Sequence, residues 1–141
     1  MKLLIDTNVI LDALMNREPW AKPAQDLILN IAEGAVEGYI TASTFTDIYY
    51  ILNKHIKNKE HTKQALISLI AIVGILDVNG IDCEKAFGLP MSDYEDALLV
   101  YCGKRHKIDY IVTRNIRHFA GSPVKAISPG ELLIDLQEGR S

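Results

Sequence analysis

Four aspartates occupy positions where carboxylates can act together in chemistry: Asp6, Asp47, Asp93 and Asp96. Asp6 directly follows an apolar run in KLLIDTNVILD, and the three-residue spacing of Asp93 and Asp96 places both carboxylates on one face of a helix. Carboxylates gathered without basic partners repel one another, and protonation or a bound divalent cation relieves that repulsion. An oxygen-only donor set, without histidine or cysteine, is typical of Mg²⁺ or Mn²⁺ and not of zinc. A hydrated ion in an acidic pocket favours phosphoryl chemistry.

Each acid also has a purely structural explanation. Asp-Thr-Asn at residues 6–8 is good turn and capping chemistry. Asp47 and Asp96 would then be carboxylates in the first turns of helices, where free N–H groups favour them. Asp93 would be an N-cap, with Glu95 or Asp96 completing the turn. For any one acid this interpretation stays open, and it is the convergence of several acids that favours a cation site.

The elements that would position these acids alternate between strands and helices. The strand-like segments are residues 2–5, 39–41, 75–78, 110–113 and 124–127. The helix-like segments are residues 8–15, an amphipathic helix from Pro23 to Gly34, a helix capped by Ser43 or Thr44, a third ended by Gly74, residues 81–87, residues 93–106, and a closing helix with Ser128 as N-cap and Pro129 in its first position. Strands separated by helices predict an α/β fold with a central parallel sheet of four or five strands, flanked by helices on both faces.

One edge of this predicted sheet collects the polar side chains. In parallel sheets the carboxyl ends of the strands form the binding edge. Asp6 lies at the carboxyl end of the first strand, and Arg114 and Asn115 follow that of the fourth. Asp47 and Asp96 are expected near the starts of helices that follow loops. Four segments therefore deliver polar side chains toward the same edge.

Length and composition fit one ordinary globular domain. The chain has 141 residues, of which 48% are hydrophobic and 23% charged, with a net charge of −3. No repeat or linker divides it, so a single domain over residues 1–141 is expected. No apolar run approaches the ~20 residues of a membrane span, and we expect a cytoplasmic protein without membrane association. Net acidity argues against bulk electrostatic coating of nucleic acid, but not against a nuclease, because cations bound to clustered carboxylates reverse the local sign.

Four sequence blocks, in order, resemble the PIN domain family, in particular the prokaryotic VapC-type toxins. They are LLIDTNVILD, ITASTFTDIYYIL, SDYEDALLVYCGKR and DYIVTRNIRHF. Their order and spacing are far more specific than any one block, and the resemblance covers nearly the whole chain. It implies a single α/β/α PIN-like domain and a Mg²⁺- or Mn²⁺-dependent endoribonuclease, a hydrolase that leaves a 5′-phosphate and a 3′-hydroxyl.

The resemblance also implies roles for individual residues. The first acid of the family motif falls on Asp6, the third on Asp96, and the second, usually glutamate, on the shorter Asp47; these three are the expected metal ligands. Asp93 is expected to assist them as a fourth catalytic acid. Where many members carry a further acid, this sequence has Arg114 and Asn115. The residues expected to hold Asp6 or a metal-bound water by hydrogen bonds are Thr7, Asn8, Thr113 and Asn115.

Basic residues stand in two local groups and after the fourth strand. The groups are Lys54, His55, Lys57, Lys59, His61 and Lys63, and Lys104, Arg105, His106 and Lys107. For both, the preference of helix C-termini for cations is the favoured explanation. Arg114, Arg117 and His118 are the candidates for contact with an RNA backbone, which would give affinity and not sequence choice. Asp12, four residues after Asn8, is expected on a solvated helix face.

The resemblance further implies partners, and two other functions stay open. A toxin of a type II toxin–antitoxin system would act on RNA, bind a small antitoxin that covers the acidic edge, and form a homodimer. One alternative is a PIN-fold RNA-binding module with weak or no cleavage. The other is an unrelated doubly wound protein that binds a phosphorylated small molecule, although the sequence lacks a glycine-rich phosphate loop after the first strand.

Overall fold

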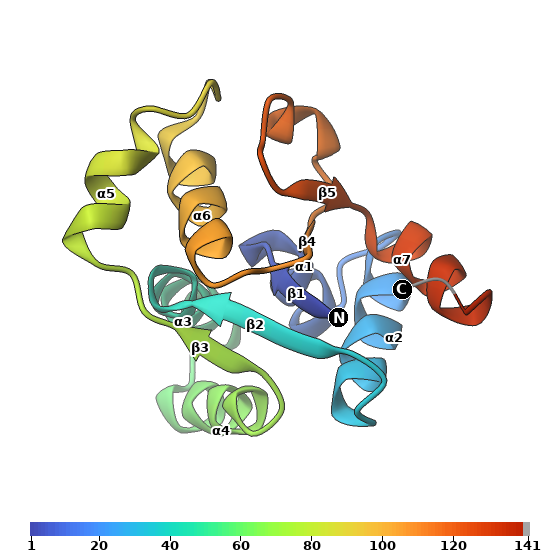
Figure 1. Cartoon of the computed structure of the whole chain (residues 1–141). Coiled ribbons are helices and arrows are strands. Elements are labelled where there is room, and N and C mark those ends of the chain that lie inside the picture. Colours follow the sequence, from blue (N-terminus) through green and yellow to red (C-terminus); the bar gives the residue numbers. More distant parts are fainter. Residues whose placement is uncertain (140–141) are drawn as a thin grey trace.

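Five strands form one parallel sheet in the order β3-β2-β1-β4-β5 (Figure 1). The computed structural model describes residues 1–139. The strands are β1 (Lys2–Ile5), β2 (Glu37–Thr41), β3 (Gly74–Leu76), β4 (Tyr110–Val112) and β5 (Lys125–Ile127). All four neighbouring pairs are parallel. The structure therefore confirms the predicted α/β class and the parallel sheet.

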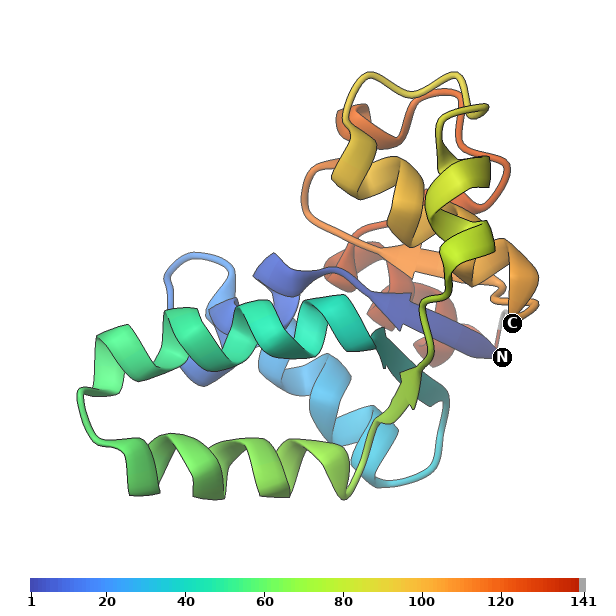
Figure 2. The same ribbon diagram turned by 90° about the vertical axis from the view of Figure 1, so that its left-hand side faces the viewer.

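Helices cover both faces of the sheet. In the described part of the chain they are α1 (Thr7–Leu14), α2 (Ala21–Ala32), α3 (Ala42–Ile56), α4 (Lys59–Ile70), α5 (Gly80–Ala86), α6 (Tyr94–Arg105), the short 3-10 helix η1 (Ile116–Phe119) and α7 (Pro129–Gln137). Along β1, Leu3 and Ile5 join a core shared with α1, α2, α3, α4 and α7, whereas Leu4 joins a second core shared with α6. Figure 2 shows α5 and α6 above the sheet and α2, α3 and α4 below it.

The order of the strands reverses next to β1. The chain runs outward from β1 to β2 and β3, and then returns to the other side of β1 to add β4 and β5. The backbone N–H of Asp6 donates to the carbonyl of Val112 at 2.9 Å, so the carboxyl ends of β1 and β4 lie side by side. Ligands bind at such switch points in open α/β sheets. The fold thus brings the segments after β1 and β4 together.

Two predicted boundaries are wrong. The N-cap of α3 is Thr41, whose Oγ1 accepts from the backbone N–H of Thr44, and not Ser43 or Thr44. Because α3 begins directly after β2, Asp47 lies in its second turn and not in the first. The preceding helix, α4, ends at Ile70, and Gly74 instead begins β3. The ring of Tyr39 leaves no room for a side chain at Gly74, since an added Cβ would lie 2.6 Å from Tyr39 Cδ1.

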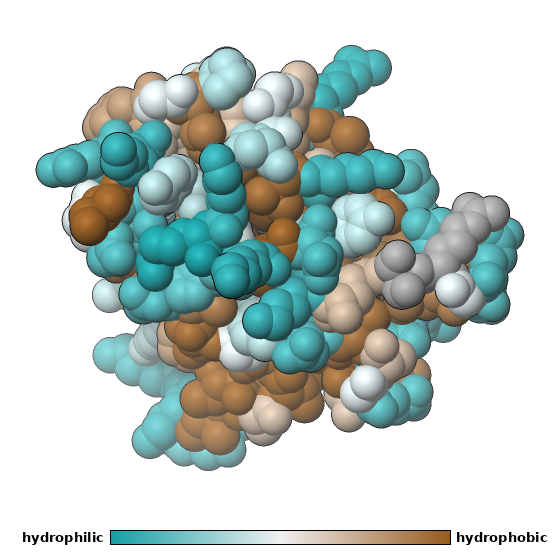
Figure 3. Space-filling model, in the orientation of Figure 1, coloured by the Kyte–Doolittle hydropathy of each residue, from teal (hydrophilic) through white to brown (hydrophobic). Residues whose placement is uncertain are grey.

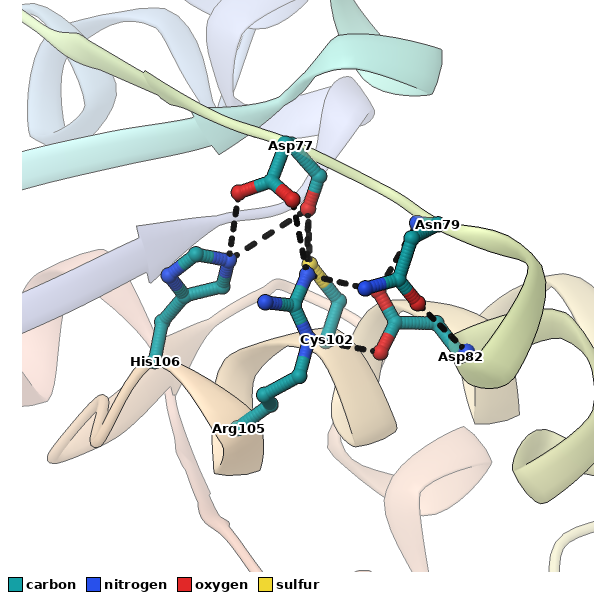
Figure 4. Close-up of polar contacts among 6 residues, drawn as sticks. All are labelled: Asp77, Asn79, Asp82, Cys102, Arg105 and His106. Atoms are coloured by element: carbon teal, nitrogen blue, oxygen red, sulfur yellow. Dashed lines mark hydrogen bonds and ion pairs between the residues drawn. The ribbon is translucent and has the colours of Figure 1, made fainter.

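A cluster of charged side chains, of which only Asp82 is fully buried, joins α5 to the end of α6 (Figure 4). Asp82, which is 0% exposed, accepts from Arg105 Nε at 2.7 Å and Arg105 Nη2 at 2.8 Å. Asp82 also forms a reciprocal capping box with Asn79. Arg105 and His106 both reach Asp77 at 3.2 Å. These partners hold the pKa of Asp82 below its usual value, chiefly through the hydrogen bonds from Arg105.

The surface is mixed in polarity. In Figure 3 hydrophobic side chains gather over α4 and β3, where Ile67, Ile70 and Ile75 are exposed. No helix in the described residues 1–139 is long and apolar enough to cross a membrane.

Candidate active site

A cavity of about 550 Å³ opens at the carboxyl edge of the sheet. Four segments line it: the start of α1, the first half of α3, the start of α6 and the segment after β4. Its polar lining residues are Asp6, Thr7, Asn8, Ser43, Thr44, Asp47, Ser92, Asp93, Glu95, Asp96, Asn115 and His118. The four acids singled out from the sequence therefore share one cavity.

Asp6 is held at the junction of β1 and β4. Its Oδ2 accepts a hydrogen bond from Thr113 Oγ1 at 2.9 Å, across 107 residues of sequence. Burial raises the pKa of Asp6, and this effect outweighs the hydrogen bonds from Thr113 and from the Thr7 backbone, which favour the ionised form. Thr113 thus orients a carboxylate whose charge is poorly solvated.

Asp93 and Asp96 begin α6 and interact directly. Asp93 is the N-cap, and its Oδ2 accepts from the backbone N–H of Asp96 at 2.9 Å. Burial, followed by the negative charges of Asp93 and Asp6, raises the pKa of Asp96 to about 6. His118 opposes this shift, with Nδ1 3.9 Å from Asp96 Oδ2. The capping and cavity-facing interpretations of Asp93 are therefore compatible.

Glu95 is a cavity residue that the sequence reasoning missed as a site residue. It lies between two aspartates in the first turn of α6, and on a helix adjacent residues do not face the same way. Burial, together with the negative charge of Asp47 and a hydrogen bond to it, raises the pKa of Glu95. Only the position of α3 beside α6 brings Asp47 and Glu95 together, so no local pattern in the sequence indicates this contact.

The five cavity carboxylates have no lysine or arginine ion pair within the described residues. In that part of the chain no three histidine, cysteine or acidic groups lie close enough to chelate a metal ion directly. Mg²⁺ usually keeps several waters and is held by one or two carboxylates, so it does not require such a cluster. The cavity acids supply only oxygen donors, which fit a hydrated Mg²⁺ or Mn²⁺ ion better than a zinc ion.

Asp12 is buried and paired, so the expectation that it lies on a solvated face is wrong. It is 1% exposed, and its oxygens lie 2.9 Å from Arg17 Nε and 2.9 Å from Arg114 Nε. The Arg114 guanidinium also stacks on Trp20, with Cζ 3.9 Å from the ring centroid. Arg114 thus ties the loop after β4 to α1, and this loop carries Thr113 and Asn115.

The other residues expected at the site lie partly at the start of α1 and partly in a hollow after β4. Asn8 accepts from Arg17 Nη2 through its carbonyl and Oδ1, at 3.2 and 3.4 Å, and so contacts Arg17 and not Asp6. The Thr7 hydroxyl reaches Thr44 at 3.5 Å. A smaller hollow of about 300 Å³ is lined by Arg114, Asn115, Ile116, Arg117 and His118, and it shares Asn115 and His118 with the acidic cavity.

Comparison with known proteins gives a family match and several structural neighbours. A family model described as PIN domain matches residues 2–117. None of the curated proteins matches the sequence. Among solved structures, DNA-bound VapBC from Salmonella typhimurium has a TM-score of 0.68 at 19% identity, with 92% of this chain and 98% of that chain covered.

Two further solved structures are similar to the chain. VapBC2 from Rickettsia felis, bound to a promoter DNA fragment, has a TM-score of 0.67 at 17% identity and covers 91% of this chain and 98% of its own. Mycobacterium tuberculosis VapC20, described as a toxin that cleaves the sarcin–ricin loop, has a TM-score of 0.62 at 14% identity and covers 77% and 86%. At these identities the likeness establishes the fold alone.

Proposed function

The chain belongs to the PIN domain family, and on that premise we propose that it is a metal-dependent endoribonuclease, the toxin of a type II toxin–antitoxin system. One observation carries the proposal: five carboxylates from three segments share one cavity without a lysine or arginine ion pair in residues 1–139. Carboxylates without such ion pairs favour the binding of a divalent cation. A bound divalent cation would in turn favour a phosphodiester substrate.

Asp6, Asp96 and Asp47 are the proposed ligands of a hydrated ion, with Asp47 reaching it through a water molecule, and Asp93 and Glu95 lie beside them. When bound, Mg²⁺ or Mn²⁺ would lower the pKa of a water and offset negative charge on the phosphate. Thr113 keeps Asp6 in place, and the backbone N–H of Asp96 fixes Asp93. The products we propose are a 5′-phosphate and a 3′-hydroxyl.

The hollow beside the cavity is the proposed path of the RNA backbone. Arg117 and His118 are exposed there, whereas Arg114 is already engaged by Asp12 and Trp20. We therefore expect Arg117 and His118 to contact phosphates, and Arg114 to contribute mainly by fixing the loop. Asn115, which lines both spaces, would orient a metal-bound water through its carbonyl oxygen.

The proposed partners are a small antitoxin and a second copy of the chain. The antitoxin is supported by the neighbours, several of which are described as VapBC or toxin–antitoxin complexes. An antitoxin that covers the acidic cavity would block both cation and RNA. The mass of the protein in solution, with and without the product of the adjacent reading frame, tests both proposals, and we propose a cytoplasmic location for the pair.

The rival function is a PIN-fold module that binds RNA but cleaves it poorly. It is favoured by Asp47 in place of the family's usual glutamate and by the uncharged Asn115. Glu95 weakens this rival, because it brings a further carboxyl group into the cavity beside Asp47.

Metal titration and RNA cleavage with antitoxin-free protein separate the two functions. We expect stoichiometric Mn²⁺ binding by calorimetry and cleavage of a total RNA pool that EDTA abolishes. Asp6→Asn and Asp96→Asn should lose both, whereas the surface control Asp26→Asn, on α2, should keep both. Metal binding without any cleavage would favour the binding module, and metal binding that survives in both cavity variants would refute the site.

A further inference from the structure

The turn between α3 and α4 carries a dense group of basic side chains. Within residues 54–63 Glu60 is the only acid. The basic residues are Lys54, His55, Lys57, Lys59, His61 and Lys63, all of them exposed. None forms an ion pair with a carboxylate in the described part of the chain. This group, the α3–α4 basic turn, places four lysines and a single acid on one exposed turn of a protein that is acidic overall.

Helix-end electrostatics explains only part of the α3–α4 basic turn. Lys54 and His55 lie in the last turn of α3, where the helix dipole favours cations. Lys59 and His61 lie instead in the first turn of α4, where the dipole disfavours them. The preference of helix C-termini, favoured from the sequence for the whole group, is therefore wrong for the α4 residues, and the positive charge of Lys59 needs another explanation.

Local hydrogen bonds define the backbone of the α3–α4 basic turn. Lys57 has a left-handed backbone, with φ of 58°, which reverses the chain. Asn58 Oδ1 caps α4 by accepting from the backbone N–H of His61 at 3.0 Å, and Thr62 Oγ1 donates to Asn53 Oδ1 at 3.0 Å. Figure 2 shows α3 and α4 side by side, with the turn projecting to the left, away from the sheet. The hydrogen-bonded backbone of the turn thus carries the lysines away from the sheet.

One face of α3 connects the acidic cavity to this turn. Asp47 and Ile51 line the cavity, and Lys54, seven residues after Asp47, continues the same helix face. At 1.5 Å per residue, Lys57 lies roughly 15 Å from Asp47 along the helix axis. Tyr50, which is 70% exposed, stands on α3 between the two ends.

We propose that the α3–α4 basic turn is a second contact surface for RNA, in which its lysines pair with backbone phosphates several nucleotides from the bond held in the cavity. This proposal rests on the ribonuclease function proposed above. Lysines without protein partners can neutralise phosphates, and an exposed aromatic ring offers a base-stacking surface, a combination typical of single-strand binding. The contacts give affinity and set the direction of the strand without reading its sequence.

Two triple variants test the proposal. Lys57→Gln/Lys59→Gln/Lys63→Gln removes three charges from the turn. Its control, Lys104→Gln/Lys107→Gln/Lys125→Gln, removes three exposed charges near the amino ends of β4 and β5. Lys107 has a φ of 60°, which matches that of Lys57. Binding of a labelled oligouridylate of about 20 nucleotides is measured in Ca²⁺ buffer by anisotropy, over a range of salt concentrations, and a gel confirms that the RNA stays intact.

The turn variant should weaken binding about tenfold or more and reduce the slope of log K against log salt by about 2, since each single-strand phosphate contact contributes about 0.7. The control should change the affinity less than about threefold and leave the slope near that of the wild type. Thermal melting verifies that both variants are folded.

Equal slopes in both variants, with a wild type that cleaves RNA, would overturn the proposal while leaving the nuclease function intact. Absence of both RNA binding and cleavage in the wild type would instead refute the function on which it rests. Unchanged RNA binding combined with lost binding of poly-L-glutamate would assign the turn to an acidic protein partner and also overturn the proposal.

Discussion

Two sets of carboxylates in this fold differ in whether a basic side chain compensates their charge. Asp82 is fully buried, receives two hydrogen bonds from Arg105, and has a lowered pKa (Figure 4). Asp6 and Asp96 face the cavity without an ion pair to lysine or arginine in the described residues, and their pKa values are raised. Asp12, which is paired with two arginines, resembles Asp82 in this respect.

The difference separates acids that have an arginine partner within the described residues from acids that lack one. A buried charge costs free energy unless a partner compensates it, and Asp82 and Asp12 have that partner within the chain. The cavity acids lack it, and perturbed pKa values in a cavity mark functional sites. Sequence alone does not make this distinction, because Asp6, Asp12, Asp82 and Asp96 are all aspartates, and their partners come from other parts of the chain.

The largest effect is expected for Asp96→Asn. Removing this carboxylate should lower RNA cleavage by at least about 100-fold. In EDTA near neutral pH the same variant should be more stable than the wild type, because it removes a poorly compensated charge. A cleavage assay and urea unfolding measure the two effects, and full activity in Asp96→Asn would contradict the assignment.

Asp82→Asn should show the reverse pattern. The amide places a donor against the Arg105 or Asn79 donors, so we expect a loss of roughly 2–4 kcal/mol in the free energy of unfolding. Cleavage per folded molecule should change little, because Asp82 lies outside the cavity lining. Urea unfolding, monitored by circular dichroism, tests this. A stability equal to that of the wild type would show that Asp82 does not stabilise the fold through its partners, as the comparison with the cavity acids requires.

The two sets should also respond oppositely to pH in metal-free protein. The folded pKa of Asp96 is about 6, above its ordinary value of 3.8, so the folded state binds more protons between these values. Stability should therefore fall as pH rises from about 4 to about 6, by roughly 1–3 kcal/mol. The pKa of Asp82 is lowered, so its contribution is present above its ordinary value and is lost as pH falls.

Unfolding free energies of the wild type and Asp96→Asn, measured in EDTA across this pH range, isolate the Asp96 contribution. Between about pH 4 and 6 the stability of the wild type should fall relative to that of Asp96→Asn. Parallel curves would show that Asp96 does not titrate as its surroundings require.

A smaller effect is expected for Thr113→Val. This variant keeps the shape of the side chain but removes the hydrogen bond to Asp6, so cleavage should fall about tenfold. Because that bond favours ionised Asp6, the acid limb of the pH–rate profile should move to higher pH. Thr46→Val is the matched control, since the Thr46 hydroxyl donates to the carbonyl of Ala42 on the exposed side of α3. An unmoved acid limb would show that Thr113 is not a positioning residue.

Much of the fold follows from local patterns. The strand at residues 2–5, the start of α6 at Asp93 and the Ser128–Pro129 start of α7 are set by side chains within a few positions of one another. Short-range capping and periodicity therefore predict them. The start of α3 was misplaced because Thr41 both ends a strand and caps the next helix, and no loop residue marks the boundary.

By itself the sequence determined the alternation of strands and helices, and with it the edge at which Asp6, Asp47, Asp93 and Asp96 gather. Only the tertiary structure decided which acids are compensated. Asp12 meets Arg114 across 102 residues, and Glu95 meets Asp47 only because α3 and α6 flank the same cavity. Charge compensation depends on the distances between packed elements. The packing of the two cores on either side of the sheet sets those distances, and spacing along the chain does not.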